Sequence, residues 1–278
     1  MAEINAEMVK KLRDATNVSM MECKRALVEA NGDMPLATKL LRERGIAVAA
    51  KKATRVANQG LLASATAEGG KVLSLVEVNC ETDFVARNAI FIAFAGKMAQ
   101  AACATDGSLT ETVQDQVVAK VAELGENIVV RRNLRYVLQG TGAIAAYIHL
   151  GGKVGVLVEV GAEKEATLQS AVFNQLVKDL TLHVAACAPR FLAPADIPAA
   201  EIAAEREIYA KQVKDKPAQI VDKIVDGKLK KFCAEICLLD QPFVKEAKQS
   251  ITALLAETAK ALDDKLTVRR FVRWQLGE

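Results

Sequence analysis

Apolar residues recur at helical spacing through the first 55 residues of the chain and predict three short helices. The first helix has its apolar face at Ile4, Met8, Val9 and Leu12. Ser19 and Glu22 form a capping box for the second helix, which ends near Gly32. Asp33 caps the third helix, whose buried stripe of Leu36, Leu40 and Leu41 ends at Gly45. Three helices of this size predict a small bundle.

The rest of the chain repeats itself. Residues 60–91 align with residues 142–173 at a constant offset of 82, without a gap. In each copy an alternating strand, a Gly-Gly turn and a Val-rich strand are followed by a helix that starts near Ala89 or Ala171. Because the Val-rich strands are apolar on both faces, we expect each to be central in its sheet.

A second match places residues 129–136 opposite residues 267–274, now at an offset of 138. Both segments alternate apolar residues with Arg, as a half-exposed third strand does. The second copy has therefore gained 56 residues, and they contain two amphipathic seams joined at Lys216-Pro217. This insertion predicts an antiparallel coiled-coil hairpin.

The predicted fold class is therefore α+β, with an N-terminal three-helix bundle, two duplicated subdomains with antiparallel sheets, and the inserted hairpin. The expected boundaries are 1–55 for the helical domain, 56–140 for the first core subdomain and 141–278 for the second, with the insertion at about 190–240.

Composition and charge argue against some classes of function. The net charge is only +3 and the aromatic content 4%, which disfavours a nucleic-acid binder that relies on bulk charge or base stacking. The first 55 residues carry eleven basic and seven acidic residues, so their partner surface is expected to be acidic. Six scattered cysteines and the lack of a long apolar span predict a reduced, cytoplasmic protein that does not bind membranes.

No constellation of residues indicates catalysis. His183 and His149 have no evident Ser or Cys partner, and Cys233 with Cys237 is too little for a zinc site. No Gly-Lys pair is followed by Ser or Thr, so the chain has no P-loop and no direct nucleotide binding is expected. We expect a protein-binding factor without a cofactor, not an enzyme.

Differences between the two copies point to contact residues. Thr82-Asp83-Phe84-Val85 lies opposite Lys164-Glu165-Ala166-Thr167. Phe84 either fills a core gap of the first copy or is an exposed contact, and the equivalent Ala favours exposure. Met20 and Met21 are adjacent at a helix start, so either one of them is an exposed contact or both fill the bundle.

Two long segments, Leu12 to Leu27 (LRxxTNxSMMxCKRAL) and Glu77 to Arg87 (EVNCETDFVAR), resemble the signature segments of bacterial translation elongation factor Ts. The resemblance extends through Gly125-Glu126-Asn127-Ile128, residues 226–232 and residues 241–244. It implies a UBA-like N-terminal domain and guanine-nucleotide exchange on elongation factor Tu.

The resemblance also implies roles for individual residues. Thr82, Asp83, Phe84 and Val85 are expected to intrude beside the partner's magnesium site and to promote GDP release. The other expected partner contacts are Leu12, Met20, Met21, Lys24, Leu124, Gly125 and His149.

The alternative is an RNA-binding module, suggested by Lys51, Lys52, Arg55 and the arginines of the third strands. Arg131, Arg132 and Arg135 fit a solvated sheet face equally well, and nucleic acid is not the expected partner.

Overall fold

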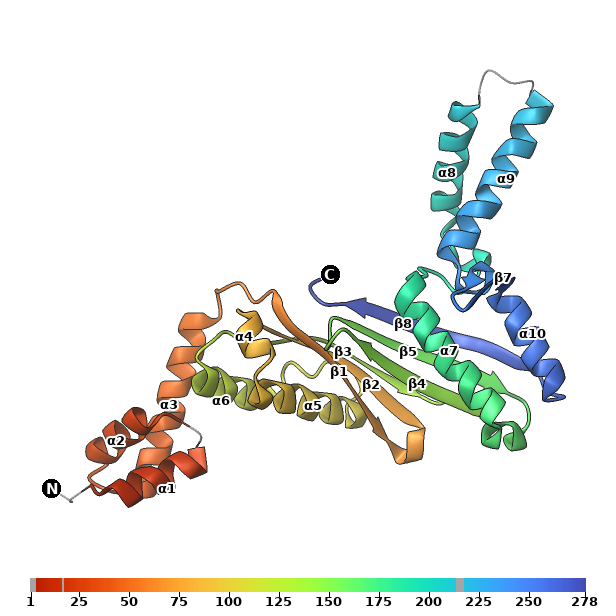
Figure 1. Cartoon of the computed structure of the whole chain (residues 1–278). Coiled ribbons are helices and arrows are strands. Elements are labelled where there is room, and N and C mark those ends of the chain that lie inside the picture. The colour runs from red at the N-terminus through yellow and green to blue at the C-terminus, as the bar shows by residue number, and fades with distance from the viewer. Residues whose placement is uncertain (1–3, 17, 214–217) are drawn as a thin grey trace.

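The computed structural model describes residues 4–16, 18–213 and 218–278. Helices at the N-terminus lead into two sheets in the middle of the molecule, and a helical hairpin projects from the far end (Figure 1). The sheets are antiparallel, so the predicted α+β class is confirmed. In the described part of the chain, no helix has the length and apolar character that a membrane crossing needs.

The N-terminal helices enclose their own apolar cluster. They are α1 (Ala6–Thr16), α2 (Met20–Glu29) and α3 (Met34–Lys52). The cluster consists of Val9, Leu12, Cys23, Ala26, Leu27, Ala30, Ala37 and Leu41. Asp33 caps α3 by accepting the Leu36 N–H at 2.8 Å, as its place before the helix predicts. We call residues 4–41 without Asn17 the helical head.

The expected end of the third helix is wrong. Helix α3 continues through Gly45 to Lys52, and Gly45 faces α6 (Gln114–Leu124), where a Cβ would lie at an ordinary contact distance of 3.5 Å from Ala122. Gly45 is therefore not a stop signal.

Two smaller expectations for the head also need correction. The capping box is half formed, since Ser19 accepts the Glu22 N–H while the Glu22 carboxylate pairs with Arg25 and Arg44. Leu36 is exposed and does not belong to a buried stripe.

The two sheets have the same topology. The first has the order β1 (Gln59–Ala67), β2 (Val72–Cys80), β3 (Val129–Val137), and the second has β4 (Gly142–His149), β5 (Val154–Ala162), β8 (Leu266–Gln275). The Val-rich strands β2 and β5 are central and buried along their whole length, as predicted. The register shifts after Glu77 in one sheet and after Glu159 in the other.

Helices cover one face of each sheet, and the other faces meet. Helices α5 (Ala89–Ala104) and α6 belong to the first sheet, and α7 (Ala171–Cys187) and α10 (Ile251–Ala261) to the second. The starts of α5 and α7 are those predicted. Between the sheets lies a second apolar layer made of Leu62, Leu73, Leu75, Tyr136, Ile144 and Leu157.

Buried Glu77 and Glu159 organise the contact between the sheets. Each accepts the Nε–H of an arginine at 2.7 Å, Arg132 for Glu77 and Arg270 for Glu159. Each arginine also reaches across to the other sheet, where it lies over Trp274 or Tyr136. Charged groups without exposure require such partners.

The other two arginines of β3, Arg131 and Arg135, also have polar partners. Arg131 pairs with Glu77 at 3.5 Å, and Arg135 donates to the Cys103 carbonyl and to Asp106. The expectation of a solvated sheet face is therefore wrong for Arg132 and Arg135, which are half-buried and paired, while Arg131 is exposed.

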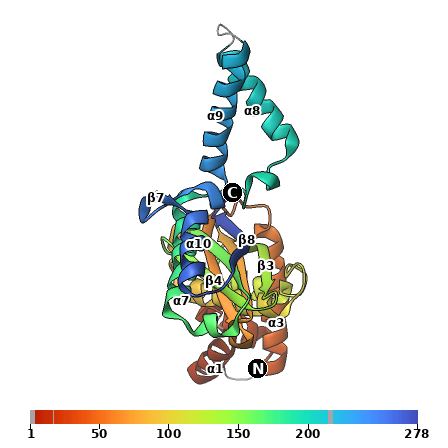
Figure 2. The same ribbon diagram turned by 90° about the vertical axis from the view of Figure 1, so that its right-hand side faces the viewer.

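The extra residues of the second copy form α8 (Ala199–Gln212) and α9 (Ala218–Ile236), two antiparallel helices that project away from the sheets (Figure 2). Val225 is buried between them and Arg206 pairs with Asp226 at 3.2 Å. The predicted tip at Lys216-Pro217 lies outside the described residues. After α9 a short hairpin, β6 (Pro242–Phe243) and β7 (Glu246–Ser250), leads to α10.

Candidate partner-binding site

The tetrapeptide Thr82 to Val85 forms the start of a one-turn helix, α4 (Asp83–Ala86), directly after the central strand β2. Thr82 is its N-cap, and its hydroxyl oxygen accepts the Val85 N–H at 3.3 Å. Asp83 pairs with Arg87 at 3.0 Å across the turn. We call residues 81–87 the wedge turn.

Phe84 is the exposed apolar residue of the wedge turn, with 83% of its surface accessible. The prediction that Phe84 is exposed is thus confirmed. Val85 instead packs against the core of the first subdomain, and Thr82 is half-buried. The turn therefore presents one large apolar side chain, which a partner can bury at a gain of about 2–3 kcal/mol.

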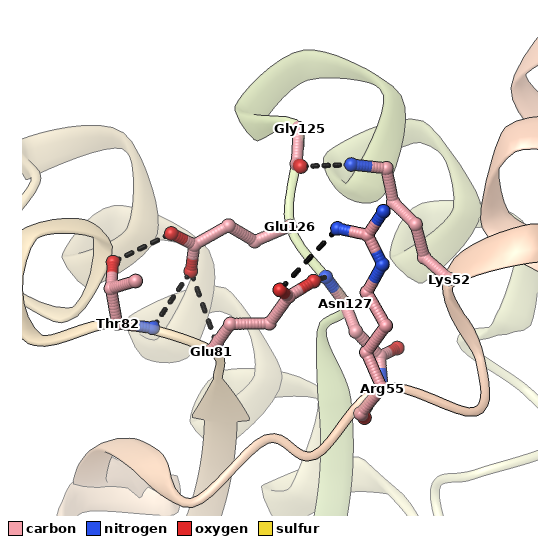
Figure 3. Close-up of polar contacts among 7 residues, drawn as sticks. All are labelled: Lys52, Arg55, Glu81, Thr82, Gly125, Glu126 and Asn127. Carbon is pink, nitrogen blue, oxygen red and sulfur yellow. Dashed lines mark hydrogen bonds and ion pairs between the residues drawn. The ribbon is translucent and has the colours of Figure 1, made fainter.

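Glu126 anchors the backbone at the start of the wedge turn. Its carboxylate accepts the backbone N–H of Glu81 at 3.1 Å, the N–H of Thr82 at 3.0 Å and the Thr82 hydroxyl at 2.6 Å (Figure 3). Glu126 follows Gly125, whose left-handed backbone, with φ of 75°, ends α6. Such a conformation suits glycine and turns the chain toward the wedge turn.

A second set of contacts joins the wedge turn and residues 125–127 to the end of α3 and the residues that follow it. The Glu81 carboxylate accepts the Asn127 N–H at 2.7 Å and faces Arg55 at 3.5 Å. The Asn127 N–H is the main cause that lowers the pKa of Glu81 below its usual value. The Asn127 side chain donates to the Arg55 carbonyl, and Lys52 donates to the Gly125 carbonyl (Figure 3).

Cys80, the last residue of β2, makes a further contact with the wedge turn. Its thiol is fully buried and lies 3.2 Å from the Thr82 carbonyl, to which it donates. Burial, with the nearby Glu126 carboxylate, raises the pKa of Cys80 to about 12. The thiol is therefore protonated and structural at neutral pH.

Some of the other predicted contact residues lie around this turn. The half-buried Leu124 ends α6 and the exposed Gly125 follows it, so both lie directly before Glu126, which contacts the wedge turn. His149 is exposed at the end of β4 in the second sheet, where its Nδ1 lies 2.8 Å from the Tyr147 hydroxyl.

Two predictions about the contact residues of the helical head need correction. Met20 and Met21 are both exposed, at 41% and 62%, where we expected one at most to be exposed. They lie with exposed Lys24 on the first turns of α2. Leu12 is fully buried in the head core, so the expectation of a direct partner contact for Leu12 is wrong. Leu12 supports the α2 surface from inside.

The described residues contain no cluster of three or more His, Cys, Asp or Glu that could hold a metal ion. Buried His183 accepts the Val244 N–H on Nδ1, so its Nε2 donates to Gln241 at 2.9 Å. Burial lowers the pKa of His183 below its usual value. The imidazole is therefore neutral and structural.

Glu126, Glu81 and Asn127 were not predicted as site residues. Their role depends on backbone N–H groups about 45 positions away, which a sequence pattern does not reveal. One signal was present: Glu126 aligns with Asp264 at the offset of the third strands, and both are acidic.

Comparisons with known proteins agree on one family. The family model described as "Elongation factor TS" matches residues 81–278. Elongation factor Ts of Clostridium perfringens is 42% identical over 288 residues, covering 99% of this chain and 93% of the relative. Those of a Nitratiruptor species and of Nitratidesulfovibrio vulgaris are 45% and 43% identical, each over 99% of this chain, and 93% and 96% of their own lengths are covered.

Proposed function

This chain belongs to the elongation factor Ts family, and on that premise we propose that it promotes GDP release from the GTPase elongation factor Tu during translation elongation. Exchange of this kind requires no covalent step. The factor binds the nucleotide-free GTPase more tightly than the GDP-bound form, and the difference drives the nucleotide out. Coupling is reciprocal, so GDP weakens the grip of the factor by the same ratio.

The observation that supports the proposal is Phe84, an exposed aromatic on a turn whose backbone is anchored on several sides. A wedge must keep its direction while it pushes on a partner. We infer that Phe84 and Asp83 enter beside the magnesium site of the GTPase, where Mg²⁺ compensates phosphate charge. Displacing the elements that hold the metal leaves that charge uncovered and weakens GDP binding.

The head supplies affinity in this account. Met20 and Met21 offer flexible apolar contacts, and Lys24 adds a positive charge beside them. Leu124, Gly125 and His149 are proposed to extend the contact on the core. A role in translation elongation places the protein in the cytoplasm, in keeping with six free cysteines.

Most of the basic residues that suggested RNA binding are paired within the protein. Arg131, Arg132 and Arg135 pair with Glu77, Asp106 and backbone carbonyls, and Lys52 and Arg55 are bound to the loop below the wedge turn. Phosphate contacts from these residues would require breaking those pairs.

The test is release of fluorescent GDP from elongation factor Tu, in excess unlabelled GDP, with catalytic amounts of the full chain. The proposal expects release to accelerate with multiple turnovers and rising GDP to dissociate the complex. Release that stays at its intrinsic rate at saturating protein would refute it.

A further inference from the structure

The carboxylate of Glu126 is placed to determine where Phe84 points. Both of its oxygens are used: Oε2 accepts two consecutive backbone N–H groups, of Glu81 and Thr82, and Oε1 accepts the Thr82 hydroxyl at 2.6 Å. Hydrogen bonds to an ionised acceptor are short and strong. These three contacts fix the two residues that precede α4.

The Thr82 hydroxyl transmits this constraint to the helix. It donates its proton to Glu126 and accepts the N–H of Val85, the residue after Phe84, at 3.3 Å. The N-cap and the first turn of α4 therefore have one orientation relative to the loop after α6. Since Phe84 lies in that turn and has no packing of its own, its direction depends on the backbone beneath it.

The second subdomain contains a similar anchor, in which the hydroxyl comes from Thr167, opposite Val85, and not from the position of Thr82. Asp264, which aligns with Glu126, accepts the N–H groups of Glu163 and Lys164 at 3.1 and 3.2 Å and the Thr167 hydroxyl at 2.6 Å. The anchor is thus part of the duplicated fold. The exposed large apolar residue belongs to the first copy, because Ala166 stands opposite Phe84 and Leu168 of the second turn packs against the core.

We propose that Glu126 is a positioning residue for nucleotide exchange, which holds the wedge turn so that Phe84 enters the partner in one fixed direction. The inference rests on the proposed function. Without the carboxylate, the free turn samples several orientations, and binding by the rest of the surface no longer places Phe84 at the magnesium site.

The experiment compares Glu126→Ala with Asp264→Ala, the matched removal of the same anchor from the other copy. For each protein, the maximal rate of GDP release and the half-saturating concentration are measured separately. Glu126→Ala is expected to lower the maximal rate roughly 10- to 100-fold, the cost of misplacing a critical group by about 1 Å. Its half-saturating concentration should stay within about twofold, because the head remains.

Two further variants separate positioning from stability. Glu126→Gln keeps an oxygen for the two N–H groups and should restore most of the maximal rate. Amide hydrogen exchange should become faster at Glu81 and Thr82 in Glu126→Ala, and at Glu163 and Lys164 in Asp264→Ala. Should Glu126→Ala fail to fold, Thr82→Val, which removes the hydroxyl contact with Glu126 and the cap of α4 but keeps both backbone N–H contacts, carries the same test with a smaller expected loss.

Equal maximal rates for wild type and Glu126→Ala, or an equal loss in Asp264→Ala, would overturn the positioning role and leave the proposed function intact. A wild-type protein that does not accelerate release would overturn the proposed function and the positioning role with it.

Discussion

The wedge turn after β2 and the corresponding turn after β5 have the same origin and different contents. Both follow a fully buried central strand, and both are held by an acidic residue that precedes the third strand. In the first copy the turn becomes a helical turn with Phe84 exposed, while in the second it is a 3₁₀ turn, η2 (Glu165–Gln169), with exposed Ala166.

This difference separates what the fold requires from what the function requires. Glu77 and Glu159 make equivalent contacts with arginine, and Glu126 and Asp264 accept equivalent backbone N–H groups in the two halves. Phe84 has no equivalent and contributes no packing that the second half needs. The comparison therefore shows that the contacts of the acidic residues belong to the duplicated fold, and it supports the proposed partner contact of Phe84.

The largest expected effect is on stability, from Glu77→Ala and Glu159→Ala. Each removes a fully buried carboxylate and leaves its arginines without the negative charge that they pair with, at a cost of about 3–5 kcal/mol. Urea unfolding should show a similar loss for both variants if the two halves are equivalent. Lys211→Ala, which removes an exposed ion pair with Glu207 within a helix, should leave the midpoint unchanged. A large loss in one half alone would break the equivalence.

The next effect is on affinity, from the double substitution Met20→Ser and Met21→Ser. Because both side chains are exposed, stability should not change. The half-saturating concentration for GDP release should rise about tenfold, or ~1.4 kcal/mol, with the maximal rate preserved. Val28→Ser, an exposed position of the same helix, is the control. A lowered maximal rate at saturation would show that the head takes part in expulsion and not only in binding.

A smaller effect is expected from pH. The Thr167 hydroxyl, as the main cause, holds the pKa of Asp264 at about 2, below its ordinary value of 3.8. Since the folded pKa is the lower one, the stabilisation is present above pH 3.8 and is lost as the pH falls through about 2. Unfolding free energies between about pH 5 and pH 2 should therefore fall less steeply for Asp264→Asn than for wild type. Parallel curves would mean that the anchor does not act through its charge.

The smallest effect is expected from Ala166→Phe, which gives the second turn the residue of the first. The position is exposed, so stability should stay within about 0.5 kcal/mol. GDP release should equal that of wild type, because a Phe on this subdomain does not reach the same part of the GTPase. Faster release would show that any exposed Phe suffices.

Features that depend on the local residue pattern could be predicted from the sequence. Runs of β-branched residues identified the central strands β2 and β5, and the mismatch between Phe84 and Ala166 identified the exposed residue. Features that depend on distant partners were missed. Helix α3 continues past Gly45 and packs against α6, and Glu126 accepts backbone N–H groups of another element. Residue type alone specifies neither contact.

The central claim is that Phe84 contacts the partner and is not required for folding. The most direct test is Phe84→Ala, measured by thermal unfolding and by GDP release from elongation factor Tu at saturating concentrations. With 83% of the Phe84 surface exposed, the account predicts a stability loss well below the ~3–5 kcal/mol of a core Phe truncation and a strongly reduced maximal rate of release. A large loss of stability, or unchanged release from a stable variant, would contradict it.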